Sequence, residues 1–237
     1  MKRNFALPVI MLLLPAFCSC NNNQQAQNTL TKAEKEEGWK LLFDGRTLQG
    51  WKSFQQPGIS GWTVEDGTLK ALGEGGDAGG DIITADQYEN FELKLDWKLA
   101  PRGNSGIMYM VREDTFSVPY ATGPEYQLLD DENFPEPVED WQLTAADYAM
   151  YVAGNKKLNP AGTWNTAKIV VDHGHVEHWL NGQKVVEYEL WSDDWKQRVA
   201  AGKWKDYPAY GSFARGYIAL QDHGSLVWFR NIRIREL

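Results

Sequence analysis

Several segments of this chain alternate between apolar and polar residues, the pattern of a β-strand with one buried and one solvated face. In residues 91–99 every odd-numbered residue is apolar and every even-numbered residue is charged. Similar runs flank Asp66-Gly67 and Asn181-Gly182, dipeptides that supply the positive φ angles of tight hairpin turns. Many short strands separated by turn signals predict an all-β fold, a β-sandwich or jelly roll.

Only two short segments have helical features. Ser192 precedes two aspartates and the run 195–201, which predicts an N-capped helix that ends before Gly202. A second short helix is expected over 144–148. The last residues of the chain, from 216 onward, are expected to form two strands joined by a turn at 222–224.

The N-terminus has the pattern of an export signal. Basic residues 2 and 3 precede an apolar stretch over 7–17, which is too short to span a membrane. We expect a lipoprotein signal peptide over 1–20 with lipidation at Cys20, a polar tether over 21–37 and a single domain over 38–237. The location would be the periplasm or the outer membrane, reached through the lipid anchor; the alternative is ordinary signal cleavage without a lipid.

Composition limits the possible partners. The formal net charge of -8 argues against nucleic acid, because binding to phosphates needs a basic surface. Both cysteines lie in the signal segment, so the exported protein would be stabilised by packing alone. The 11 Trp and 10 Tyr suit either a sugar-binding surface or an aromatic core.

Polar residues at predicted strand ends are the candidates for a site. His223 follows a strand, with Gln221 on the same side, and histidine is the commonest general acid or base. Glu125 and Gln127 share one face of another strand. Asn104 begins a third strand and Arg112 lies at its other end, so both are candidates to bind hydroxyl or carbonyl groups.

Two other chemistries have less support. A conventional glycosidase needs a pair of carboxylates, and Gln127 stands where the β-sandwich glucanase spacing requires aspartate. His173, His175 and His178 would not share one strand face, so we interpret them as hairpin surface residues rather than a zinc site. No cofactor is expected, although Asp130, Asp131 and Glu132 could supply oxygen ligands for Ca²⁺ and leave that question open.

An ordered set of motifs resembles one known family. The motifs, from about Trp39 to the C-terminus, are WKLLFDG (39–45), LQGW (48–51), WTVEDGTL (62–69), YENFEL (88–93), NSGI (104–107), EYQLLD (125–130), GTWN (162–165), LNG (180–182), LQDHG (220–224) and FRNI (229–232). Their order is similar to that of the 3-keto-disaccharide hydrolase family of Bacteroidetes.

The resemblance implies a concanavalin-like jelly roll and the cleavage of glycosides already oxidised to a ketone at C3. A C3 ketone acidifies the C2 proton, so one base can start a β-elimination that expels the C1 oxygen, and water then adds to the enone. This chemistry needs a base, an acid and a stabiliser of the enolate, but no carboxylate nucleophile. We expect Glu125 and His223 to be the base and the acid, in an order left open, and Asn104, Arg112, Gln127 and Gln221 to hold the sugar or the enolate.

A non-catalytic carbohydrate-binding module of the same fold is the competing interpretation, because a fold does not fix a function. The loops over 120–124 and 133–139 would shape the substrate groove, and their sequences leave the aglycone preference open.

Overall fold

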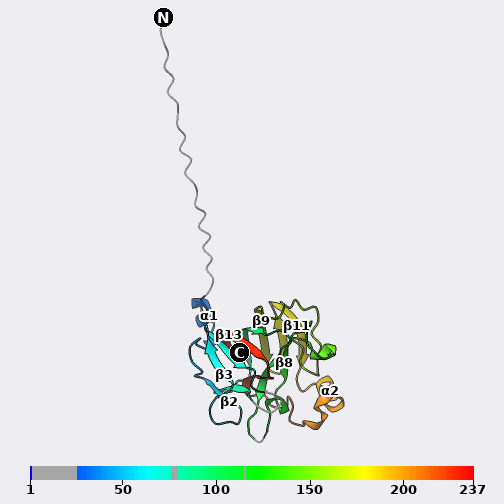
Figure 1. Cartoon of the computed structure of the whole chain (residues 1–237). Coiled ribbons are helices and arrows are strands. Elements are labelled where there is room, and N and C mark those ends of the chain that lie inside the picture. The colour runs from blue at the N-terminus through cyan, green and yellow to red at the C-terminus, as the bar shows by residue number, and fades with distance from the viewer. Residues whose placement is uncertain (2–25, 76–79, 115) are drawn as a thin grey trace.

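The computed structural model describes residue 1 and residues 26–75, 80–114 and 116–237. It has two antiparallel sheets packed face to face, with α1 and α2 at opposite ends (Figure 1). The eight-stranded sheet runs in the order β11 (Gln183–Glu189), β10 (His175–Leu180), β9 (Asn165–Asp172), β6 (Phe91–Leu99), β13 (Leu226–Glu236), β4 (Thr68–Leu72) and β3 (Trp62–Glu65), with β1 (Lys40–Leu41) also paired to β13. The five-stranded sheet runs in the order β2 (Trp51–Ser53), β5 (Ile82–Thr84), β12 (Tyr217–Leu220), β7 (Asn104–Val111) and β8 (Glu125–Leu129). The predicted all-β jelly-roll sandwich is confirmed.

The eight-stranded sheet follows the alternation in the sequence. In β6 the apolar side chains of Phe91, Leu93 and Leu95 are buried in the core, whereas Lys94 and Asp96 lie on the partly solvated outer face. The same alternation of buried and accessible residues runs through β9 and β10. Burial of one face of each strand fixes the register, because a slip of one residue would expose the whole apolar set.

The five-stranded sheet is buried on both faces. Ile107 and Tyr109 belong to the core between the sheets. Met108 packs on the opposite face, in a small cluster with Phe54, Ile83 and Ala219. The loops that follow β7 and β8, together with the segment after α2, cover that opposite face and enclose a cavity there.

Helix α2 (Asp193–Ala201) forms where the sequence predicts it, and Ser192 Oγ accepts the N–H of Trp195 at 3.1 Å. Trp195 belongs to a run of stacked rings that begins at Tyr151 and passes through Tyr188, Trp195 and Tyr210 to Trp204, with centroid separations of 4.1–5.6 Å. Short 3₁₀ turns occupy η1 (Pro119–Ala121), η2 (Asp140–Gln142) and η3 (Lys203–Asp206). The stack attaches α2 and η3 to the sandwich.

The predicted helix over 144–148 is wrong. Thr144, its expected cap, instead bonds strand β8: its hydroxyl donates to Leu129 O at 2.7 Å and accepts the N–H of Leu129 at 3.0 Å. Asp147 forms isolated β-bridges with Tyr126 and Tyr151. Side-chain bonding to the neighbouring strand therefore outweighs the local helical preference.

The two closing strands do not form a hairpin. Strand β12 lies between β5 and β7 in the five-stranded sheet, whereas β13 lies between β6 and β4 in the other sheet. The loop over 221–225, which contains His223, therefore crosses from one sheet to the other. Crossing is favoured because each strand fills the centre of a different sheet, and the local sequence carries no information about that choice.

The described part of the predicted tether packs against the domain. Helix α1 (Lys32–Glu36) begins at a capping box formed by Thr31 and Glu34, and Glu34 pairs with Arg233 at 3.1 Å. Asn28 is buried, and Asn28 and Asn231 exchange backbone N–H to side-chain Oδ1 bonds of 2.7 and 2.8 Å. The signal segment and Cys20 lie outside the described residues. Among the helices of the described ranges, none has the length and apolarity to cross a membrane.

Candidate active site

A cavity of about 430 Å³ lies on the face of the five-stranded sheet that points away from the other sheet. Its floor is polar and comes from the sheet, and one wall is aromatic and comes from loops and η3. The lining residues are Asp81, Asn104, Glu125, Gln127, Gln221 and His223 on the floor side, Tyr120, Tyr148, Lys203, Trp204 and Tyr207 on the wall, and Phe54–Gln56, Gly80 and Ser117–Pro119 around them.

Five of the six residues expected at the site line this cavity: Asn104, Glu125, Gln127, Gln221 and His223. Arg112 does not. It follows the far end of β7, about 26 Å along an extended strand from Asn104 at about 3.3 Å per residue. Its guanidinium pairs with Asp114 at 2.6 Å and lies over the ring of Phe213. The strand is too long for both of its ends to reach one sugar.

The sheet register explains why the floor residues meet. Gly106 pairs with Gln127 across β7 and β8, and the N–H of Gln221 donates to Gly106 O at 3.0 Å. Leu220 pairs with Ile82, so the next residues along these strands, Gln221 and Asp81, are adjacent. Asp81, Gln221, Gly106 and Gln127 thus form one row across four strands.

Glu125 is 5% exposed and its side chain covers Gly106. A Cβ at position 106 would lie 2.0 Å from Glu125 Oε1, so only glycine leaves space for this carboxyl group. Burial raises the pKa of Glu125 to about 8; the charge of Lys203 opposes this shift and that of Asp81 adds to it. A carboxyl group with a pKa near neutral can exchange protons at physiological pH.

A second carboxyl group, which the sequence motifs did not reveal, belongs to Asp81. Burial raises the pKa of Asp81 to about 7; the N–H of Asp222, which donates to Asp81 Oδ1 at 2.9 Å, lowers it, and the charge of Asp222 raises it. The cavity therefore holds two carboxyl groups from residues 44 positions apart in sequence (125 − 81). The glucanase spacing that the sequence lacks at Gln127 could not reveal this pair, because motif spacing finds only carboxyl groups that are close along the chain.

The positively charged residue of the site, Lys203, was also not predicted from the sequence. Lys203 Nζ lies 4.2 Å from the ring centroid of Tyr148 and 5.1 Å from that of Trp204. These aromatic faces hold the ammonium group at the cavity, where its charge acts on Glu125. No pattern around residue 203 distinguishes it from an ordinary surface lysine.

Two residues of the cavity lining have buried side-chain oxygens without a partner. Asn104 Oδ1 and Gln221 Oε1 have no hydrogen-bond partner among the described residues. Asn104 Nδ2 lies 3.5 Å from His223 Nδ1, which links the two predicted residues directly. Buried polar atoms are normally satisfied, so a rotation that turned these amides to the cavity would let them accept the hydroxyl groups of a sugar.

The other histidines do not form a zinc site together. His178 is fully buried, so its interpretation as a surface residue was wrong, whereas His173 is exposed. Nδ1 of His178 lies 3.0 Å from the carbonyl of Ala145 and must carry the proton, and its Nε2 therefore accepts the Tyr109 hydroxyl at 2.9 Å. Burial lowers the pKa of His178 to about 4, so the ring is a neutral core group.

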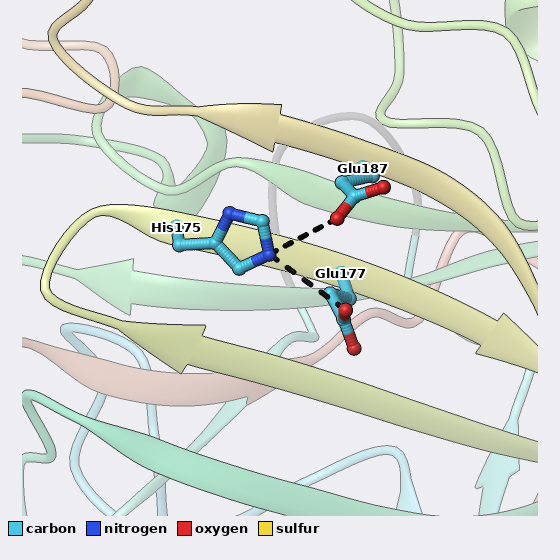
Figure 2. A group of neighbouring side chains, drawn as sticks. All are labelled: His175, Glu177 and Glu187. Atoms are coloured by element: carbon cyan, nitrogen blue, oxygen red, sulfur yellow. Dashed lines mark ion pairs between the residues drawn. The ribbon is translucent and has the colours of Figure 1, made fainter.

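One group on the eight-stranded sheet has the spacing of metal ligands. Figure 2 shows His175 and Glu177 from β10 and Glu187 from β11 pointing toward one another. Lys184 lies 3.1 Å from Glu177 and 2.8 Å from Glu187, so an internal cation already pairs with both carboxylates. This group lies on the sheet that does not form the cavity.

Two of the three suggested calcium ligands, Asp130 and Asp131, are engaged with protein groups, and the third, Glu132, is exposed. Asp130 Oδ2 accepts the N–H of Arg102 at 2.7 Å, and Asp130 Oδ1 accepts from Asn133 at 3.2 Å. Asp131 pairs with Lys156 at 2.6 Å and accepts the N–H of Thr144. In the structure these carboxylates stabilise the loop that follows β8.

Comparison with known proteins identifies the family. Residues 38–235 match the model of the family described as 3-keto-alpha-glucoside-1,2-lyase-like domain. A Bacteroides thetaiotaomicron protein named 3-keto-disaccharide hydrolase is 37% identical over 229 aligned residues, which cover 85% of this chain and 79% of that protein. A crystal structure of a candidate glycosyl hydrolase from Parabacteroides distasonis has a TM-score of 0.85 at 44% identity, covering 90% of this chain and 100% of that one. A second structure from that organism with the same description has a TM-score of 0.65 at 28% identity, covering 84% and 99%. The chain belongs to the 3-keto-alpha-glucoside-1,2-lyase-like family, as its ordered motifs predicted.

Proposed function

We propose that this protein is an enzyme that cleaves glycosidic bonds, and that its substrates are glycosides carrying a ketone at C3. The observation that carries the proposal is the placement of Glu125, buried and with a raised pKa, in a cavity together with a cation and unpaired hydrogen-bonding oxygens. The names of the similar proteins support the same reaction class.

The proposed reaction begins at C2 of the sugar. Glu125, in its ionised form, takes the C2 proton, whose acidity comes from the adjacent ketone. Negative charge then develops on the C3 oxygen, where the positive charge of Lys203 and a hydrogen bond from His223 stabilise it. Collapse of the enolate reforms the ketone, makes the C1–C2 double bond and expels the C1 oxygen. Addition of water to the enone yields the 3-keto sugar.

The aromatic wall suits the other part of the substrate. Tyr120, Trp204 and Tyr207 pack against one another, with centroid distances of 5.7–6.3 Å. Flat rings at the edge of a polar cavity can stack on the apolar face of a second sugar or of an aromatic aglycone. In this proposal the floor selects the oxidised sugar and the wall binds the group that leaves.

A binding module without activity is the alternative. Such a module has no need for two buried carboxyl groups with pKa values near neutrality, which are costly to keep and are concentrated at catalytic sites. The cavity therefore favours the enzyme.

The deciding experiment compares each glycoside with its 3-keto derivative. The protein is incubated with a glucose disaccharide, with the same disaccharide oxidised at C3, and with the matching aryl glucosides, and products are measured by mass spectrometry. Release of aglycone from the keto forms alone supports the proposal. Cleavage of the unoxidised forms would indicate a conventional glycosidase, and binding without turnover of any form would indicate a binding module.

A further inference from the structure

Asp81 is placed to exchange a proton in the cavity that Glu125 also lines. It precedes β5, lies in the same row of the sheet as Gln221, and lines the cavity together with Glu125. Its Oδ1 accepts the N–H of Asp222 at 2.9 Å, which fixes the direction of the carboxyl group. The elimination described above uses Glu125 at C2 and leaves the C1 oxygen without a proton donor.

The surroundings of Asp81 favour its protonated form. Asp222 is fully buried beside it, and its two oxygens accept the N–H groups of Gly224 and Gly75, each at 3.1 Å. Burial raises the pKa of Asp222, whereas these backbone donors favour its charged form. The titratable groups near Asp81 are thus Asp222, whose N–H it accepts, and the other titratable residues that line the same cavity, which include Glu125, His223 and Lys203.

We propose that Asp81 is the catalytic acid that protonates the leaving oxygen at C1, with its direction fixed by the backbone N–H of Asp222. The inference rests on the proposed cleavage of 3-keto-glycosides and names the second proton-transfer group of the same site. Glu125 then acts on carbon in its ionised form and Asp81 acts on oxygen in its neutral form. Since the pKa of Glu125 is about 8 and that of Asp81 about 7, this active pair is a minor protonation state near neutral pH.

The proton balance closes over one turnover. In the elimination the C2–H bond breaks and its proton goes to Glu125, while the C1–O bond breaks and the leaving oxygen takes the proton of Asp81. In the hydration Asp81, now a carboxylate, takes a proton from water as the hydroxyl group adds to C1, and Glu125 returns its proton to C2. Both groups regain their starting states, and no oxidant or metal is required.

The test uses the dependence on the leaving group. Asp81→Asn keeps an oxygen that can accept the Asp222 N–H but cannot donate an acidic proton. A 3-keto disaccharide expels a sugar alkoxide and needs the acid, so its kcat should fall by about 100-fold or more. A 4-nitrophenyl 3-keto-glucoside expels a stable phenolate, so its kcat should fall by less than about fivefold.

The matched control is Glu125→Gln. This variant should lower kcat by the same factor on both substrates, because removal of the C2 proton precedes departure of either leaving group. Equal losses for both substrates in Asp81→Asn would overturn the inference. If the wild type cleaved no keto substrate, the proposed function itself would be the statement that failed.

A second variant distinguishes the loss of a proton donor from a folding defect. Asp81→Ala leaves space for a small acid, so added ammonium, which keeps its proton at neutral pH, should restore turnover of the disaccharide in a concentration-dependent manner and have little effect on the nitrophenyl substrate. Restoration by ammonium, but not by the same concentration of formate, confirms that the missing element is a proton donor. Failure of ammonium to restore turnover in a protein with native circular dichroism would count against the assignment.

Discussion

The two sheets of this sandwich differ in what their sequences reveal. The eight-stranded sheet exposes one face, so β6, β9 and β10 alternate visibly between apolar and charged residues. The five-stranded sheet is buried on both faces, and β8 contains only buried residues, including Glu125 and Gln127. Polar residues in a strand that is buried on both faces do not contact bulk solvent. They therefore need another explanation, and here they mark the site.

The difference also separates two kinds of charge. On the eight-stranded sheet, Glu177 has its charge balanced by Lys184, and the hydrogen bonds of Trp179 and Lys184 lower the pKa of Glu177 against the effect of burial. On the five-stranded sheet burial raises the pKa of Glu125, and among the described residues the charge of Lys203 opposes that shift without cancelling it. Charges on the first sheet stabilise the surface, and those on the second are available for chemistry.

The largest effect that tests this contrast should come from Glu125→Gln. Loss of the base should lower kcat on a 3-keto-glycoside by about 10³-fold, the scale of a general base in a positioned site. Steady-state kinetics measure the change. The matched control is Glu177→Gln, which should leave kcat within about twofold; a similar loss in both variants would contradict the contrast.

The pH dependence of stability should differ between Glu125→Gln and the wild type. The folded state holds the Glu125 proton up to a pKa of about 8, whereas the unfolded chain releases it near the ordinary value of 4.5. The folded state thus binds more protons in this window, so wild-type stability falls as pH rises from about 4.5 to about 8.

The Glu125→Gln variant does not lose stability through this side chain as the pH rises. Its free energy of unfolding should exceed that of the wild type by up to a few kcal/mol at pH 8.5 and should match it at pH 4, where the side chain is neutral in both states. Urea titrations at the two pH values measure the difference. A gap that does not change with pH would show that Glu125 has an ordinary pKa.

A smaller effect should follow from Gly106→Ala. The new Cβ would lie 2.0 Å from Glu125 Oε1 and would displace the carboxyl group, so kcat should fall by about 10- to 100-fold in a folded protein. Gly154→Ala is the control, because its Cβ would meet only Val185 O, at 3.9 Å. Full activity in Gly106→Ala would show that the position of Glu125 is not critical.

The smallest effect should be on stability and should come from the N-terminal segment that packs against the eight-stranded sheet. Asn28→Ala removes the side-chain oxygen that accepts the N–H of Asn231 and should destabilise the domain by about 1 kcal/mol without changing kcat. Lys35→Ala, on the exposed face of α1, should change neither quantity. Unchanged stability in Asn28→Ala would mean that the N-terminal segment contributes nothing to the fold.

Local sequence was sufficient for much of this structure. The strands β10 and β11, the Asn181-Gly182 turn between them and the cap of α2 all depend on neighbouring residues, and all were predicted correctly. Polar residues at strand ends also identified five residues of the cavity. Asp81 follows the same rule, since it precedes a buried strand of the same sheet, and a search for every such residue would have found it.

Other features could not be derived from local patterns. Lys203 reaches the cavity because α2 and η3 are attached by stacked rings from distant segments. His178 reads as a surface residue between Glu177 and Trp179, yet the sandwich places it against Tyr109 and Ala145. In each case the deciding partner is far away along the chain.

By itself, then, the sequence determined the strands, the turns, the family and most of the polar floor, because these depend on residue order over short distances. The tertiary structure alone decided that β12 and β13 enter different sheets, that Arg112 stays away from the cavity, and that Asp81 joins Glu125. The physical reason is that burial and charge act through space, so the pKa values that make carboxyl groups useful exist only once distant segments have excluded water from around them.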